Sequence, residues 1–158
     1  MKKIFTLLFL TNIFFNSHLY SQRIVDTRNL GLDTTGKSDV SSTLNNIIDS
    51  LSSAGGGTIL IPSGKFLLEN AIILQSFIHL KGVSESETIF FRKKDSKNWT
   101  DPKIQALITT NPSVKNEEIS VEKISINGNF EKGQLSAKGG ICLRNCTKSN
   151  INDVTTEN

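Results

Sequence analysis

After Ala54 the sequence is a succession of short apolar segments separated by polar or glycine-containing corners, with no helix of normal length. The first two segments, in "TILIPSGKFLL", flank a turn at Pro62-Ser63-Gly64, where proline suits the second turn position and glycine accepts a positive φ. Further segments follow as "AIIL", "FIHLKGV", "TIFFR", "ALITT", "ISVEKISING", "GICLR" and "INDV". This pattern predicts a strand-rich sandwich or solenoid and does not support a βαβ nucleotide-binding fold.

The later segments favour the solenoid. In "EEISVEKISINGN", apolar side chains fall on one side of the strand across a polar break. The stretch "GICLRNCTKSNINDV" has the same order of glycine, short strand, Asn-containing corner and short strand. Recurrence about every 20–30 residues is typical of stacked coils, none of which buries its inner face alone. We therefore expect Ile59, Ile78 and Ile126 to point into one elongated core.

A helix precedes these strands. Between Asp39 and Ala54, apolar residues recur at the spacing of one helical face, namely at Leu44, Ile47, Ile48 and Leu51. Asp39 or Ser41 can cap its start, and the run Gly55-Gly56-Gly57 ends it. Because these glycines follow a helix and precede a strand, they suit a tight reversal better than a phosphate loop. The sequence predicts a capping helix at about residues 40–54.

The stretch "GLDTTGKS", Gly31 to Ser38, matches the phosphate-binding P-loop pattern. A P-loop also needs a buried strand before its first glycine and a magnesium-binding acid on a later strand, and neither is evident. We interpret these residues as a loop that leads into the helix, without nucleotide binding.

The first residues have the order of a secretory signal peptide. Two lysines precede an apolar run from Ile4 to Phe15, and a polar tail ends near Ser21. The run is shorter than the roughly 20 residues that span a bilayer, and the alternative is a buried N-terminal helix. We expect residues 1–21 to be removed, residues 22–158 to form a single domain, and the mature chain to be secreted or periplasmic, without a membrane anchor.

Removal of the signal peptide changes the composition that bears on function. Two of the 18 basic residues leave, so 16 basic residues face 15 acidic ones, and the chain has no basic excess for nucleic acid. His79 becomes the only histidine, which excludes a histidine-rich zinc site. The two cysteines, Cys142 and Cys146, are expected as an exposed thiol and a small core residue, with a disulfide as the alternative.

Taken together, these motifs resemble the N-terminal part of right-handed parallel β-helix proteins of the pectate lyase superfamily, the type shared with polygalacturonases, rhamnogalacturonases and epimerase-like proteins. The resemblance rests on the helix, then "GGGTILIPSGKFLL", then "FIHLKGV" in the expected order. It is close over residues 30–82 and looser to Asn158. Thr35-Gly36-Lys37 replaces the usual Gly-Asp-Gly, and Val40 replaces an acid; these changes create the P-loop likeness.

The resemblance implies an incomplete, all-β solenoid with an N-terminal capping α-helix. Relatives that cleave polysaccharides place acids, basic residues or calcium ligands along their middle coils, and those coils would lie beyond Asn158. No matching acid pair occurs here, so we carry over no catalytic residue, no metal and no cofactor. His79 is expected to face outward as a surface residue, and Glu117 and Glu118 to be solvated charges.

One segment, "RKKDSKNWTDPK", is a candidate for substrate binding because cations surround the only tryptophan. An aromatic face with nearby cations suits sugar stacking and attraction to polyuronate. The candidate substrate-binding residues are Arg92, Lys93, Lys94, Lys97 and Trp99. The alternative, which we favour, is a solvated corner loop with Trp99 folded onto its own coil.

The leading hypothesis is therefore a secreted β-helix segment of a protein that cleaves or modifies an acidic polysaccharide, as a lyase or a hydrolase. The alternative is a non-catalytic polysaccharide-binding or adhesive β-helix. The chain ends at "TTEN" within the coil pattern, so we expect either a fragment or a partner that replaces further coils. On its own this chain is expected to be inactive.

Overall fold

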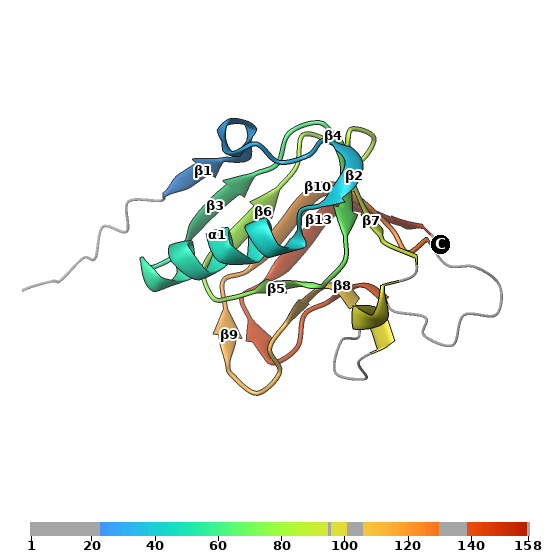
Figure 1. Ribbon diagram of the computed structural model, residues 1–158. Helices are drawn as coiled ribbons and strands as arrows, with labels where there is room; N and C mark the ends of the chain where they lie inside the picture. Colours follow the sequence, from blue (N-terminus) through green and yellow to red (C-terminus); the bar gives the residue numbers. More distant parts are fainter. Residues whose placement is uncertain (1–22, 95, 101–105, 130–138, 158) are drawn as a thin grey trace, which may run out of the picture.

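The computed structural model describes residues 23–94, 96–100, 106–129 and 139–157, and in this part the chain winds as stacked coils of parallel strands (Figure 1). The strands are β1 (Ile24–Asp26), β2 (Thr35–Asp39), β3 (Gly57–Leu60), β4 (Gly64–Leu68), β5 (Ile72–Leu74), β6 (Ile78–Lys81), β7 (Thr88–Arg92), β8 (Ala106–Thr110), β9 (Asn116–Glu117), β10 (Ser120–Asn127), β11 (Gly139–Cys142), β12 (Cys146–Thr147) and β13 (Asn150–Glu157). The helices are α1 (Ser41–Ser53) and two 3₁₀ turns, η1 (Thr27–Leu30) and η2 (Lys97–Thr100). No helix among these residues is long and apolar enough to cross a bilayer.

All strand pairs given by the structure are parallel, as the solenoid prediction requires. The largest sheet has the order β1-β3-β6-β10-β7-β4-β2, and β13 also pairs with β10. The first half of β10 pairs with β6 and its second half with β7, and between them Lys123 has a φ of 56°. The sheet therefore turns a corner at Lys123. The other sheets are β11-β8-β5 and β12-β9, which complete the right-handed coil.

The core is a stack of apolar side chains from successive coils. The register aligns Val25, Ile59, Leu80 and Val121, one from each of four neighbouring strands. Ile59, Ile78 and Ile126 are all fully buried in this core, which confirms the predicted inward direction. Because alternate residues of a strand point to opposite faces, the intervening positions face outward in similar stacks.

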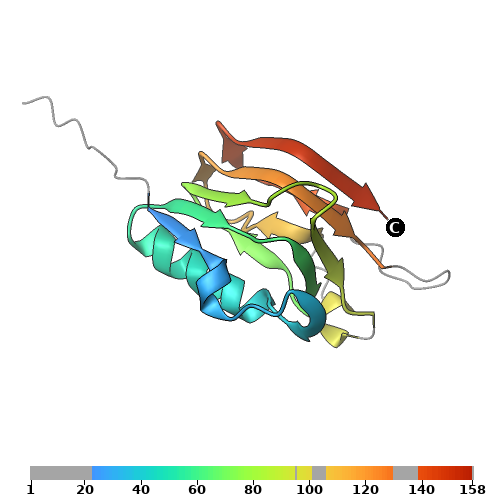
Figure 2. The ribbon, with the colours of Figure 1, turned by 90° about the horizontal axis from the view of Figure 1, so that it is seen from above.

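Helix α1 covers one end of the coils, and β13 lies at the other (Figure 2). Leu44, Ile48 and Leu51 are buried against the first coil, which confirms the predicted capping helix. Val40 occupies the N-cap position, and the Asp39 carboxylate next to it accepts the backbone N–H groups of Ser41 (3.0 Å) and Glu69 (2.9 Å). This carboxylate ties the start of the helix to the end of β4.

Two local expectations need correction. The stretch Gly31–Ser38 is not a loop throughout, because Thr35–Asp39 is strand β2, which pairs with β4. Cys142 and Cys146 are both half-buried free thiols, so the expected difference, with Cys142 more exposed than Cys146, is not observed. Cys146 packs against the core, in agreement with its predicted role, and the alternative disulfide is not formed. The predicted signal peptide, residues 1–21, lies outside the described residues.

Candidate functional site

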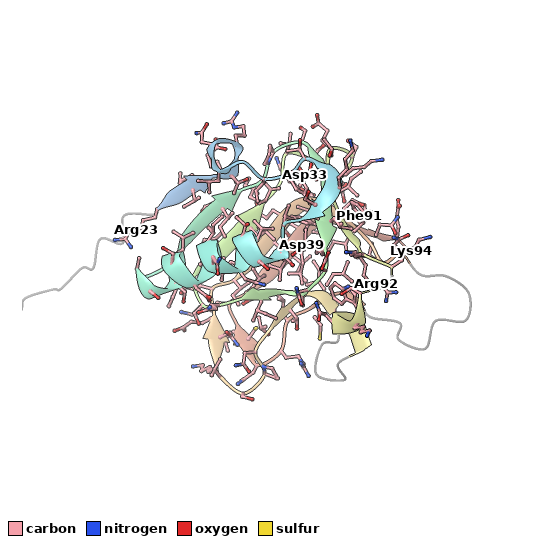
Figure 3. All side chains as sticks on the ribbon, in the orientation of Figure 1. Arg23, Asp33, Asp39, Phe91, Arg92 and Lys94 are labelled. Atoms are coloured by element: carbon pink, nitrogen blue, oxygen red, sulfur yellow. The ribbon has the colours of Figure 1, made fainter. Side chains whose placement is uncertain are left out.

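The segment proposed for sugar stacking does not present its aromatic residue to solvent. Trp99 is 1% exposed and belongs to the core, and Arg92 is 2% exposed at the end of β7 (Figure 3). This burial contradicts Arg92 and Trp99 as contacts for a polysaccharide, since neither side chain is accessible, and it agrees with the favoured alternative. The tryptophan in this cationic segment therefore contributes to the apolar core.

The lysines of the same segment remain on the surface. Lys93, Lys94 and Lys97 are exposed. Lys93 forms an ion pair with Glu69, and this hydrogen bond raises the pKa of Lys93. The structure therefore keeps three of the five proposed residues accessible, but without an aromatic face between them.

The P-loop likeness has a structural explanation in Asp33. Its carboxylate accepts the backbone N–H groups of Thr35 (2.8 Å), Lys37 (2.7 Å) and Ser38 (2.6 Å), and the hydroxyl of Thr35 (2.6 Å). These bonds, the Thr35 hydroxyl first, hold the pKa of Asp33 well below its usual range. The N–H groups that would cradle a phosphate are thus occupied by a carboxylate of the chain itself, which disfavours nucleotide binding here.

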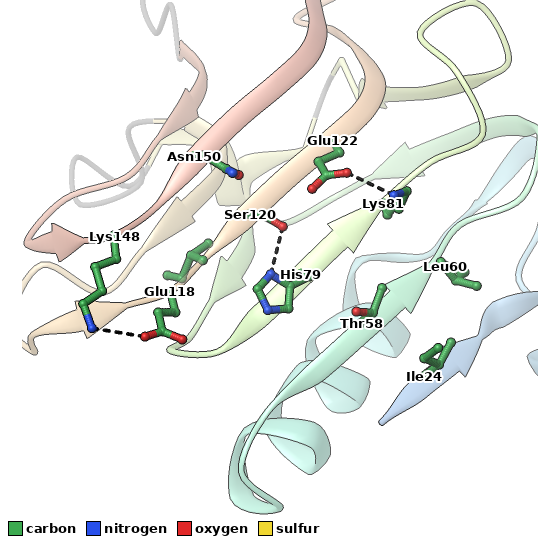
Figure 4. Close-up of a pocket in the computed structure, with 11 residues that line it drawn as sticks. Ile24, Thr58, Leu60, His79, Lys81, Glu118, Ser120, Glu122, Lys148 and Asn150 are labelled. Carbon is green, nitrogen blue, oxygen red and sulfur yellow. Dashed lines mark hydrogen bonds and ion pairs between the residues drawn. The ribbon is translucent and has the colours of Figure 1, made fainter. Parts of the chain in front are cut away.

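A groove of about 620 Å³ lies on the outer face of β1, β3, β6, β10 and β13 (Figure 4). The strand register builds it from two rows of outward side chains that run across the strands. The first row is Ile24, Thr58, His79, Ser120 and Asn150. The second row is Asp26, Leu60, Lys81, Glu122 and Asn152, of which Leu60, Lys81 and Glu122 line the groove. Neighbouring strands are about 4.8 Å apart, so each row offers side chains at a regular spacing along the coil axis.

Three polar pairs shape this groove, and each joins neighbouring coils. The Nδ1 atom of His79 lies 2.9 Å from the hydroxyl of Ser120. The Nζ atom of Lys81 lies 3.2 Å from a carboxylate oxygen of Glu122. At the groove's edge, the Nζ atom of Lys148 lies 3.3 Å from Glu118. His79 faces outward as expected, but the structure places it inside a groove rather than on open surface.

The arrangement suits binding of a polar, extended ligand. Lys81 and Lys148 are cations whose ion pairs are partly solvated, with 42% and 69% of the lysine side chains exposed. Partly solvated ion pairs contribute little to stability, so a lysine that turns from its glutamate toward an anionic ligand loses little free energy. Within the described ranges, no group of three or more His, Cys, Asp or Glu side chains could hold a metal ion.

Sequence reasoning missed this groove because its residues come from separate coils. The segments "IHLK" and "SVEK" both carry polar residues at alternating positions, and this was the available signal. Their alignment depends on loop lengths, and these vary: His79 and Ser120 occupy equivalent positions but are 41 residues apart. Glu118, which we expected to be a solvated charge, is one member of an ion pair at the groove's edge.

The comparisons with known proteins agree with this architecture. Alginate lyase 7 of Azotobacter vinelandii is 26% identical over 121 residues, which cover 72% of this chain and 14% of that protein. The A-module of the mannuronan C-5 epimerase AlgE4 from the same organism superposes with a TM-score of 0.66 at 17% identity, over 85% of this chain and 38% of that one. PfbA, a surface adhesin of Streptococcus pneumoniae, superposes with a TM-score of 0.63 at 20% identity, over 85% and 33%.

The two solved structures share the fold of this chain, and the chain spans well under half the length of each of the three proteins. The family model described as "Rhamnogalacturonase A/epimerase, pectate lyase-like" matches residues 24–116, from β1 to the start of β9. The matched region includes the capping helix and the first two coils. This chain therefore belongs to the rhamnogalacturonase A/epimerase, pectate lyase-like family of parallel β-helix proteins.

Proposed function

We propose that this chain supplies the capped first coils of an exported protein that acts on an acidic polysaccharide. In this proposal residues 1–21 are a signal peptide, and the groove around His79 and Lys81 binds part of the polysaccharide. The complete protein cleaves or modifies the polymer by lyase or hydrolase chemistry. Membership of the family and the alginate lyase similarity support the substrate class.

The observation that carries the proposal is the alignment of polar side chains along the coil axis. The two rows cross five strands, and they bring together residues that are far apart in sequence. A linear polymer that lies along the axis meets one row position per coil. Lys81 and Lys148 offer cationic groups to the carboxylates of such a polymer, while Glu118 and Glu122 balance the net charge, so the attraction is local to each lysine.

The groove is proposed to bind the polymer rather than to cleave it. A hydrolase needs two carboxyl groups that face each other across the bond, one of them protonated. Here the carboxylates of Glu118 and Glu122 each form an ion pair with a lysine of a neighbouring coil, so they do not form a facing pair of free carboxyl groups. A lyase needs a base together with charge neutralisation at the uronate. His79 is the one histidine of the proposed mature chain, so no second histidine can assist it in this groove.

The alternative function is a non-catalytic binding or adhesive β-helix. The similarity to the streptococcal adhesin favours it, because that protein shares the architecture. The two functions differ in turnover. The purified chain is incubated with pectin, polygalacturonate and alginate, with and without calcium, and assayed for unsaturated and reducing ends. Turnover that persists after repurification would contradict a groove that only binds.

Calorimetry with hexamannuronate tests the binding groove. Lys81→Ala should weaken binding about fivefold to tenfold, since it removes a cation worth about 1 kcal/mol and leaves Glu122 facing the ligand. Glu122→Gln should tighten binding, because it removes a negative charge beside the polyanion. Raising the salt concentration should weaken the binding of hexamannuronate to the parent chain and to both variants.

Lys115→Ala is the matched control, since Lys115 is exposed in the loop before β9 and does not line the groove. It should leave the affinity for hexamannuronate within a factor of two. Equal losses in Lys81→Ala and Lys115→Ala would mean non-specific attraction and would overturn the proposed groove. Absence of hexamannuronate binding to the parent chain would do the same.

A further inference from the structure

A second groove, of about 560 Å³, lies on the outer face of β4, β7, β10 and β13. It lies beyond the corner that Lys123 and Asp153 make, each with a positive φ, and it shares no residue with the groove around His79. Its lining includes Lys65, Glu85, Phe91, Asn127, Asn129 and Glu157. A concave site of this size with an aromatic side chain and a few polar groups is typical of small-ligand binding.

Phe91 is the aromatic residue of this groove and points away from the core. On β7, Phe90 and Arg92 are buried, whereas Phe91 between them is only half-buried and faces outward (Figure 3). Gly36 lies against the edge of its ring: a methyl group at Gly36 would be 2.7 Å from Cε1 and 2.8 Å from Cζ. The absence of a side chain at Gly36 therefore lets β2 pack against one side of the ring. This packing restricts the orientation of the Phe91 ring.

Two asparagines beside the ring are fixed by the backbone. In the strand register Asn127 is the neighbour of Phe91, and its Oδ1 atom accepts the N–H of Asn129 at 2.7 Å. The Nδ2 group of Asn129 donates to the carbonyl of Arg92 at 3.0 Å. These bonds orient both amides. They point to the Nδ2 group of Asn127 as a donor and the Oδ1 atom of Asn129 as an acceptor for a ligand.

We propose that this second groove binds a neutral pyranose unit, independently of the polyanion groove. The C–H face of the sugar packs on the ring of Phe91, and its hydroxyl groups bond to Asn127 and Asn129. The charges favour a neutral sugar over a uronate, because Glu85 and Glu157 outnumber Lys65. Glu85 is held in place by a 3.0 Å hydrogen bond from the hydroxyl of Thr155.

The test compares mannohexaose with hexamannuronate, because the two probes differ by the carboxylates. Each is titrated into the ¹⁵N-labelled chain and followed by NMR and calorimetry. Mannohexaose should shift signals of Phe91, Asn127 and Asn129, and its affinity should change little with salt. Phe91→Leu should weaken it about tenfold, Phe91→Tyr should keep it within about threefold, and Lys81→Ala should leave it unchanged.

Urea unfolding of each variant verifies that it is folded, and Phe91→Tyr keeps the test informative if Phe91→Leu is unstable. Mannohexaose that does not bind, or that binds Phe91→Leu as tightly as the parent chain, would overturn the second groove. Loss of mannohexaose binding in Lys81→Ala would show one shared site instead. The first groove fails separately, through hexamannuronate and Lys81→Ala.

Discussion

Substitution of Gly82 by alanine tests the stacking of the coils directly. Gly82 follows β6, and its N–H donates to the carbonyl of Glu122 in the next coil at 2.9 Å. A methyl group at Gly82 would lie 2.2 Å from the backbone carbonyl oxygen of Lys123 and 2.8 Å from side-chain atoms of Ile124 and Thr88. Relief of this contact requires one coil to move away from the next, because a backbone oxygen cannot rotate aside.

The expected cost follows from these contacts. Overpacking typically destabilises by about 1–3 kcal/mol, and a weakened hydrogen bond to Glu122 adds about 1 kcal/mol. We expect Gly82→Ala to lower the free energy of unfolding by about 3 kcal/mol. With a urea dependence of about 1.5 kcal/mol per molar, the unfolding midpoint should fall by about 2 M urea.

Gly31→Ala is the matched control for this experiment. Gly31 has a φ of 69° and nothing within 4 Å of the added methyl group, so only the left-handed backbone conformation opposes alanine there. That conformation costs about 1 kcal/mol, and the midpoint should fall by less than 1 M urea. Unfolding is followed by circular dichroism. If Gly82→Ala has the same urea midpoint as Gly31→Ala, the inferred close contact between the second and third coils is wrong.

Three further predictions concern residues of the motifs. The pKa of Asp33 is lowered in the folded chain, so its carboxylate stabilises the fold above the unfolded pKa of about 4. This contribution is lost as the pH falls through the folded pKa. The urea midpoint of Asp33→Asn should therefore be lower than that of the parent chain at pH 7 and approach it at pH 3. Lys37→Ala should change the unfolding free energy by less than about 0.5 kcal/mol, and calorimetry with ATP and magnesium should show no binding to the parent chain; saturable binding lost in Lys37→Ala would restore the P-loop interpretation. Trp99→Ala should cost about 3–5 kcal/mol, and emission of Trp99 that is readily quenched by acrylamide would contradict its burial.

The helix and the coil class were readable from the sequence because both depend on local periodicity. The spacing of Leu44, Ile48 and Leu51 defines one helical face wherever the helix lies, and the structure buries all three. The glycine run after the helix likewise has a local cause, since Gly55 and Gly56 have φ values of 97° and 101°. The alternation in "SVEK" and "IHLK" determined which side chains face outward.

The same local rules could not decide how an irregular segment folds back. The composition around Trp99 is compatible with a surface platform and with a buried side chain, and only the tertiary packing shows that Trp99 belongs to the core. The carboxylate of Asp33 is a comparable case. Its four hydrogen bonds follow from a turn whose backbone geometry the P-loop pattern does not specify.

The sequence by itself determined a helix followed by a series of short strands, because apolar periodicity and glycine corners act within a few residues. The tertiary structure alone decided the two grooves. They depend on the register between coils, which brings Lys81 beside Glu122 and Phe91 beside Asn127. Loops of different length separate these coils, so equivalent positions have no fixed spacing in the sequence. Only the backbone hydrogen bonds between stacked strands set which side chains become neighbours.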